Sequence, residues 1–131
     1  MAVGRGPSGK IHNVAGIRLS AVRAGIRYKD KLDLVLIQLS EGSKSAGVFT
    51  KNAFCAAPVV IAKSHLSSHN PRVLIINTGN ANAGTGDIGL QDALECCQAV
   101  AEWNEIEIQQ VIPFSTGVIG EKLPVKKIVA G

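Results

Sequence analysis

The sequence predicts an α/β fold in which a sheet and helices pack in layers as a sandwich, with most strands in the N-terminal part. Short apolar runs alternate with turn residues up to about residue 77, and the pattern then changes to the period of an amphipathic helix. Hydrophobic residues make up 46% of the 131 residues and charged residues only 18%, which argues against disorder. Because aromatic residues are only 4%, aliphatic side chains must build the core of one domain, or of a large piece of one.

Residues 1–12 contain no apolar run and predict a flexible tail, whereas residues 13–131 show no linker that would divide them. In the first half of this unit the apolar runs predict five strands, at residues 14–22, 32–39, 46–50, 58–63 and 72–77. The run at 32–39 is mostly apolar, so we expect it to be buried on both faces and to form a hairpin with 46–50. Pro58 begins its predicted strand, where a missing N–H group costs little.

The period between residues 87 and 103 predicts a helix that begins after an N-cap at Asp87 and stops at Asn104. Its apolar stripe consists of Leu90, Ala93, Leu94, Cys97, Val100 and Ala101. Its polar stripe consists of Gln91, Asp92, Glu95, Gln98 and Glu102. Residues 111–115 then predict a short strand, and Pro124 is expected to be the first residue of a helix that ends at Gly131.

The composition excludes two classes of partner. The formal net charge is +4, but the basic residues are scattered and few aromatic residues accompany them, so no nucleic-acid surface is expected. No apolar run approaches the roughly 20 residues that a bilayer span requires, so no membrane segment is expected. The three cysteines, Cys55, Cys96 and Cys97, include no CxxC pair, which predicts reduced thiols in a cytoplasmic protein, with Cys97 in the core.

The loop at residues 77–86 is unusual because Gly, Ala, Asn and Thr fill it between an apolar strand and a helix. Backbone N–H groups in such a loop can bind an anion at the helix N-terminus, although an ordinary connection explains the composition equally well. Gly84, Gly86 and Gly89 also fit the G-x-G-x-x-G pattern of a dinucleotide-binding oxidoreductase. That pattern should follow its strand directly, whereas six residues separate Asn77 from Gly84, so the oxidoreductase remains the alternative function.

The segment at residues 113–120 suggests a different chemistry. A hydroxyl residue followed by Gly at the end of a strand can direct a side-chain O–H and a backbone N–H to one point, as an oxyanion hole requires. Thr116 and Gly117 are therefore the candidate catalytic residues, with a plain turn as the alternative. His65 and His69 are four residues apart but lack further ligands, so we expect solvated loop histidines and no metal site.

Three segments together resemble the ornithine acetyltransferase family, the bifunctional glutamate N-acetyltransferases of arginine biosynthesis. They are AGVFTKNAFCAAPV at residues 46–59, INTGNANAGTG at 76–86 and PFSTGVIGE at 113–121. VAGIR at 14–18 and LPVKKI at 123–128 also fit, so the resemblance covers nearly the whole chain after residue 12. Three long motifs in the expected order are far more specific than a glycine pattern alone.

The resemblance implies an N-terminal-nucleophile-like architecture. Members of the family cleave themselves autocatalytically, and the new N-terminal threonine of the second chain takes the acetyl group of N-acetylornithine and passes it to glutamate. The resemblance assigns stabilisation of the oxyanion to the Thr116 hydroxyl and the Gly117 N–H, and polar contacts or shaping of the site to Asn80 and Asn82. It implies no cofactor, although some members use acetyl-CoA as a co-substrate.

The sequence departs from the family in length, since family members continue well past the point where this chain ends. We therefore expect the nucleophilic threonine to lie on a beta chain cut from the same precursor. The resemblance suggests a heterotetramer of two alpha and two beta chains, with residues 13–131 as the N-terminal part of the alpha chain. Gly131 is then expected to be a truncation, a boundary of disorder or a processed end.

Overall fold

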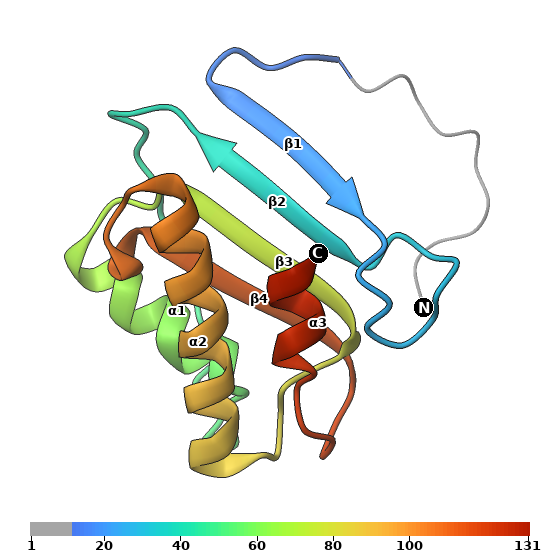
Figure 1. Cartoon of the computed structure of the whole chain (residues 1–131). Helices are drawn as coiled ribbons and strands as arrows, with labels where there is room; N and C mark the ends of the chain where they lie inside the picture. The colour runs from blue at the N-terminus through green and yellow to red at the C-terminus, as the bar shows by residue number, and fades with distance from the viewer. Residues whose placement is uncertain (1–11) are drawn as a thin grey trace.

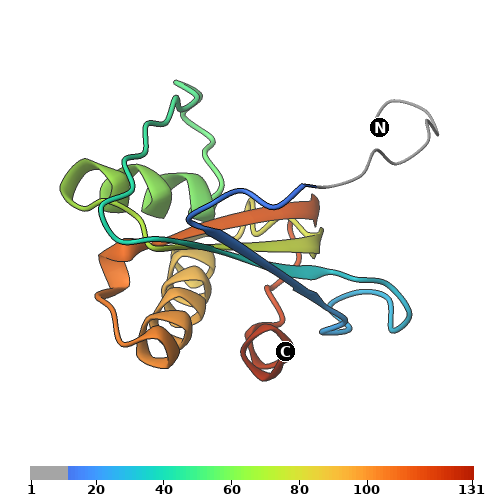
Figure 2. The same cartoon turned by 90° about the horizontal axis from the view of Figure 1, so that it is seen from above.

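The computed structural model describes residues 12–131, so the predicted tail lies outside the described residues except at His12. One mixed sheet has the strand order β1 (Ile17–Val22), β2 (Leu34–Leu39), β3 (Val73–Asn80), β4 (Val111–Val118). β1, β2 and β3 are antiparallel neighbours, and β4 runs parallel to β3. α2 (Gly86–Asn104) and α3 (Val125–Ala130) lie on one side of the sheet, and α1 (Ala57–Ser68) packs beside β4 (Figure 1, Figure 2). The predicted α/β layers are therefore confirmed.

The core fills the space between the sheet and α2. Val73 and Ile75 of β3 and Val111 of β4 point to this side, where they meet Cys97 and Ala101 of α2. Each of these residues is at most 5% exposed, and burying a side chain as large as Val or Ile stabilises a fold by roughly 1.5–3 kcal/mol. Because neighbouring strand residues point to opposite faces, this packing fixes which residues of β3 and β4 face away from the helices.

Two of the five predicted strands are wrong. Residues 58–63 belong to α1, which begins with Ala57 and Pro58 in its first turn, where proline needs no N–H partner. A short apolar run fits a buried helix as well as a strand, so the pattern alone could not decide. Residues 46–50 form no strand and no hairpin with β2, and the Val48 side chain is fully exposed.

The other predicted strands exist, but β2 is less buried than expected. Only Leu34 of β2 is buried, and the rest of the strand is half-buried. Leu36 and Gln38 line a groove beside α2 and α3, whereas Val35 and Ile37 lie on the opposite face of the sheet. The predicted strands at 14–22, 72–77 and 111–115 correspond to β1, β3 and β4, of which β3 and β4 both extend three residues further.

The predicted helix at residues 87–103 is confirmed as α2, with Asn104 as its last residue. Its N-cap is Thr85 rather than Asp87. Asp87 lies in the first turn, where its negative charge interacts favourably with the positive end of the helix dipole. Asp92 is buried although it falls on the polar stripe, and Leu94 is 39% exposed although it falls on the apolar one. Pro124 is the N-cap of α3 rather than its first residue.

Cys97 is fully buried in the core, as predicted, and Cys96 beside it is buried as well. Burial raises the pKa of the Cys96 thiol to about 12, with smaller contributions from the carboxylates of Glu95 and Asp92. Burial likewise raises the pKa of the Cys97 thiol to about 12. Both thiols are therefore protonated at neutral pH and unsuited to nucleophilic chemistry. Within residues 12–131, no helix has the length and hydropathy of a membrane span.

Candidate active site

Thr116 and Gly117 lie near the C-terminal end of β4, beside Thr78 and Gly79 at the end of the parallel strand β3. Both candidate residues are exposed. By strand alternation, Thr116 shares the sheet face of Phe114, which points away from α2 and α3. The pairing of β3 and β4 shifts register at Gly79 and Asn80, so the ladder is irregular where the two candidate residues lie.

Glycine is required at position 117 for two reasons. Its φ of 137° lies in the region that side chains with a Cβ rarely adopt. A Cβ built on Gly117 would also overlap the carbonyl group of Gly79 and lie 2.5 Å from the Asn80 N atom. Gly79 has a φ of 104°, and a Cβ there would lie 2.9 Å from the Cβ of Arg27. Two glycines thus stack their backbones closely, which fixes the main chain at the candidate site.

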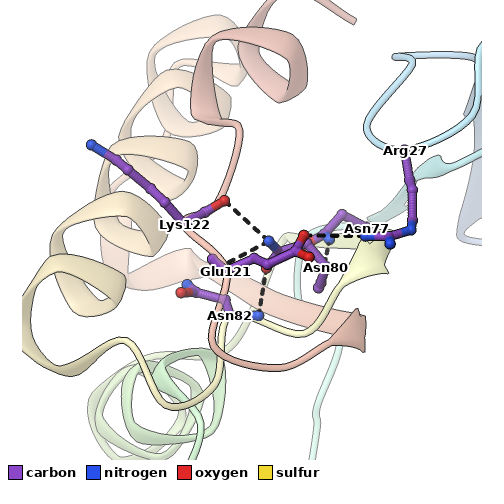
Figure 3. Close-up of polar contacts among 6 residues, drawn as sticks. All are labelled: Arg27, Asn77, Asn80, Asn82, Glu121 and Lys122. Atoms are coloured by element: carbon purple, nitrogen blue, oxygen red, sulfur yellow. Dashed lines mark hydrogen bonds and ion pairs between the residues drawn. The ribbon is translucent and has the colours of Figure 1, made fainter.

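A chain of side-chain hydrogen bonds connects β4 to the loop after β3, and Figure 3 shows the part of it from Asn77 onward. The Ser115 hydroxyl donates to Asn77 Oδ1 at 2.6 Å. Asn77 Nδ2 donates to the Asn80 carbonyl at 2.8 Å. Asn80 Nδ2 in turn donates to the carbonyls of Glu121 and Lys122, both at 3.1 Å. Asn80 is buried, so its amide ties the turn after β4 to the end of β3.

Asn82 is completely buried and adopts a φ of 45°, which asparagine tolerates better than most residues. Its N–H donates to Asn80 Oδ1 at 2.8 Å, and its side-chain Nδ2 donates to the Gly89 carbonyl in α2 at 2.8 Å. The Thr85 hydroxyl donates to Asn82 Oδ1 at 3.1 Å, and the Asn82 carbonyl accepts from the N–H of Ala57 at 3.1 Å. Asn80 and Asn82 therefore hold the loop at residues 77–86 in shape from inside the protein.

The sequence pattern did not single out Asp33, which stabilises the loop opposite Gly79. Its carboxylate is buried and accepts from the N–H groups of Ala24 at 2.8 Å and Ile26 at 2.6 Å. Its main-chain carbonyl accepts from the Thr78 N–H at 2.9 Å. The only available signal was an aspartate directly before an apolar strand, where its side chain can close a turn.

This loop places Arg27 at the rim of the candidate site. The Arg27 Nη1 atom lies 3.1 Å from Glu121 Oε2, and both side chains are substantially exposed (Figure 3). Hydrogen bonding to Tyr28 and the charge of Glu121 raise the pKa of Arg27 above its ordinary value, so Arg27 is always charged. Because the Arg27–Glu121 ion pair is exposed to solvent, it contributes little to the stability of the fold.

The three glycines of the dinucleotide pattern have structural explanations. A Cβ on Gly89 would overlap the Thr85 hydroxyl and lie 2.6 Å from Asn82 Oδ1, so close packing within the protein requires this glycine. Gly84 and Gly86 have positive φ values of 71° and 59° in the turn that leads into α2. The pattern begins after β3 has ended at Asn80 and Ala81–Ala83 have intervened, rather than directly at the strand end.

The prediction of two solvated loop histidines is wrong for His65 but holds for His69, which follows α1 and has a side chain that is 36% exposed. His65 is a buried residue of α1, and its Nδ1 atom lies 2.8 Å from the Val111 carbonyl of β4. His69 is the C-cap of α1, and its Nε2 atom lies 3.1 Å from Glu107 Oε2. Within the described part of the chain, no group of three or more His, Cys, Asp or Glu side chains is arranged to hold a metal ion.

Within residues 12–131, the sheet face that carries Thr116 is apolar and open. Leu19 is 60% exposed, Phe114 is 44% exposed, and Ile37 and Ile76 between them are half-buried. Figure 2 shows α2 and α3 on the other side of the sheet. A contiguous apolar surface of this kind is typical of a face that packs against further polypeptide.

Comparisons with known proteins agree with one another. The profile of the ArgJ family matches residues 18–131. The arginine biosynthesis bifunctional protein ArgJ of Pseudomonas syringae pv. tomato is 51% identical over 128 residues, which cover 98% of this chain and 31% of the relative. The protein of the same name from Pseudomonas fluorescens is also 51% identical over 128 residues, with the same coverage. This chain thus spans about a third of the length of the curated relatives it matches.

Two solved structures have the same fold. The crystal structure of arginine biosynthesis bifunctional protein ArgJ from Bacillus halodurans superposes with a TM-score of 0.84 at 34% identity, covering 89% of this chain and 61% of that one. The crystal structure of ornithine acetyltransferase from Mycobacterium tuberculosis, complexed with ornithine, superposes with a TM-score of 0.80 at 39% identity. That match covers 89% of this chain and 64% of the other.

Proposed function

Because this chain belongs to the ArgJ family, we propose that it forms part of an acetyltransferase that moves the acetyl group of N-acetylornithine to glutamate in arginine biosynthesis. The observation that carries the proposal is the position of Thr116 and Gly117, exposed at the end of β4 on a backbone that the contact with Gly79 fixes. A rigid backbone is what electrostatic stabilisation of a transition state requires.

The proposed role of this chain is to stabilise negative charge. When a nucleophile attacks an acetyl carbonyl, the carbonyl oxygen becomes an oxyanion. The Thr116 hydroxyl and the Gly117 N–H would donate hydrogen bonds to that oxygen, and each such donor typically contributes about 3 kcal/mol of transition-state stabilisation. Asn80 and Asn82 would act indirectly, because their buried hydrogen bonds hold the adjacent loop in place.

We propose that the nucleophile is the N-terminal threonine of a beta chain released by autocatalytic cleavage of the same precursor. Its hydroxyl attacks the acetyl carbon, its own amine accepts the proton, and the C–N bond of N-acetylornithine breaks as ornithine leaves with a proton. The amine of glutamate then attacks the resulting ester and regenerates the threonine. Two half-reactions with a shared acetyl-enzyme predict ping-pong kinetics.

The open sheet face supports a partner at this position. Thr116 lies on the same face as the exposed side chains of Leu19 and Phe114, so polypeptide that covers this apolar surface also reaches the oxyanion site. We propose that the beta chain packs here, and that two such pairs assemble into a heterotetramer in the cytoplasm. An apolar interface would account for the aliphatic side chains that this face otherwise exposes to water.

The relatives carry the word bifunctional in their names. We propose that the second activity is acetylation of glutamate by acetyl-CoA, because the same acetyl-enzyme can be formed from a thioester. Neither reaction needs a metal or a cofactor, since the acetyl group is activated by the nucleophile and the oxyanion donors alone. The glycine loop is assigned to structure rather than to a dinucleotide, because close internal contacts explain Gly89.

Trapping the acetyl-enzyme tests the proposal. The complete enzyme is mixed with N-acetylornithine carrying a deuterated acetyl group, quenched with acid, digested and mapped by mass spectrometry. The proposal predicts a deuterated acetyl group on an N-terminal threonine outside residues 1–131, which disappears when glutamate is added. A label on any residue of this chain, or the absence of any transfer to glutamate, would contradict it.

A further inference from the structure

A basic loop connects β1 to β2 at the end of the sheet where β3 and β4 finish (Figure 1). Within residues 23–33, this loop exposes one acidic side chain, Asp30, and four basic side chains. The basic residues are Arg23, Arg27, Lys29 and Lys31. A surface with an excess of one charge attracts ligands of the opposite charge, so the basic loop favours an anionic ligand.

The main chain of the basic loop is held in place by residues at its base. The buried carboxylate of Asp33 accepts from the N–H groups of Ala24 at 2.8 Å and Ile26 at 2.6 Å. Lys127 of α3 donates from Nζ to the Gly25 carbonyl at 2.7 Å, which adds a further positive charge beside the loop. Because the loop is already ordered, a ligand that binds it pays a smaller cost in conformational entropy.

The basic loop begins beside the candidate oxyanion site. A Cβ on Gly79 would lie 2.9 Å from the Cβ of Arg27, and Gly79 pairs with Gly117 across the two strand ends. The charge of Arg27 is met by Glu121, whose Oε2 atom lies 3.1 Å from Arg27 Nη1. The positive charge that can bind a ligand therefore comes mainly from the lysines that follow Arg27 along the loop.

An exposed aromatic ring lies among these charges. The Tyr28 side chain is 53% exposed, and Lys31 Nζ lies 4.5 Å from the centre of its ring. Nucleotide bases stack on exposed aromatic side chains, and neighbouring basic side chains pair with the phosphates that the bases carry. Tyr28 with Lys29 and Lys31 thus combines the two kinds of group that recognise a phosphorylated nucleoside.

We propose that the basic loop binds the phosphorylated adenosine of acetyl-CoA, an inference that rests on the proposed acetylation of glutamate by acetyl-CoA. Acetyl-CoA carries its thioester at one end of a long pantetheine arm and its adenine and phosphates at the other. A charged loop beside the acetyl-transfer site, rather than inside it, matches that separation. Lys29 and Lys31 pair with the phosphates, and the Tyr28 ring stacks on the adenine. N-acetylornithine has neither group, so the loop acts on only one of the two acetyl donors.

Steady-state kinetics of the complete enzyme with different acetyl donors tests the proposal. The variant is Lys29→Gln with Lys31→Gln, and the control is Lys44→Gln with Lys63→Gln, which removes the same charge from exposed positions on other parts of the fold. In the loop variant, the KM for acetyl-CoA should rise by about fivefold or more. Its KM for N-acetylornithine and for S-acetylpantetheine, which lacks the nucleotide, should stay unchanged, and the control should keep all three values.

Calorimetric titration with adenosine 3′,5′-bisphosphate provides a readout that does not depend on activity. The bisphosphate should bind the wild-type enzyme and the control, and bind about fivefold or more weakly to the lysine variant and to Tyr28→Ala. No binding to the wild-type enzyme, equal affinity for the loop variants and the control, or a rise in the KM for S-acetylpantetheine equal to that for acetyl-CoA would overturn the proposal. Loop-dependent binding by an enzyme that transfers no acetyl group from N-acetylornithine would support the nucleotide site and contradict the proposed function.

Discussion

Replacing Gly117 with alanine is expected to damage the protein through the backbone of β3. The added methyl group would overlap the Gly79 carbonyl and lie 2.5 Å from the Asn80 N atom, while φ would remain at 137° or force the strand end to move. A residue held in such a region of φ costs about 1–3 kcal/mol. Crowding a packed site by one methyl group typically costs about 1–3 kcal/mol more.

The two costs add to about 2–6 kcal/mol, a large part of the ~5–15 kcal/mol by which domains are stable. Gly120→Ala is the matched control, because Gly120 has a φ of 80° with nothing within 4 Å of an added Cβ. It keeps the backbone penalty of about 1–2 kcal/mol and lacks the overlap. The assay is urea denaturation of the complete enzyme, read as the free energy of unfolding for each variant. If Gly117→Ala were no more destabilising than Gly120→Ala, the close stacking of the two strand ends would be refuted.

Three further predictions concern the surrounding residues. Asn82→Ala removes two buried hydrogen bonds and should lower the free energy of unfolding by about 2–4 kcal/mol in urea denaturation, and a loss below about 1 kcal/mol would contradict the buried network. Burial raises the pKa values of Cys96 and Cys97 from 9.0 to about 12, so both thiols should resist iodoacetamide at pH 8 while the partly exposed Cys55 reacts, as peptide mapping can check. Because the folded state holds these two protons more tightly than the unfolded state, the free energy of unfolding should fall as pH rises from 9 toward 12. Glu121→Gln removes an exposed ion pair and should leave the unfolding midpoint nearly unchanged, so a large drop would assign that pair a structural role.

The α/β layers of the fold could be predicted because hydrophobic residues are spaced differently in helices and in strands. The change to a 3.6-residue period at residue 87 identified α2 almost to the residue, and the apolar runs identified β2, β3 and β4. α1 was mistaken for a strand because PVVIAK contains no polar residue until Lys63, and the helix continues into the serine-rich turn that follows. The apolar first half of α1 alone does not distinguish a helix from a strand, because a short apolar run fits both.

The position of the candidate site could be predicted from the sequence, but the contacts that hold its backbone in place could not. The sequence placed Thr116 and Gly117 near a strand end, and the structure has them there. Gly79 stacks against Gly117, which lies 38 positions further along the chain, and Asp33 accepts from the N–H of Thr78, which lies 45 positions further along. Spacing along the chain contains no information about which backbones meet across a sheet until the register is known.

We propose that this chain supplies the donors that stabilise the oxyanion while the nucleophile comes from elsewhere. The most direct test is Thr116→Ala in the complete enzyme, with Thr116→Ser as the control that keeps the hydroxyl. Because Thr116 is exposed, the substitution should leave the fold intact. We expect kcat for acetyl transfer to fall by about 10²–10³ in Thr116→Ala, with substrate binding nearly unchanged, and much of kcat to be retained in Thr116→Ser. An unchanged kcat in Thr116→Ala would contradict the account.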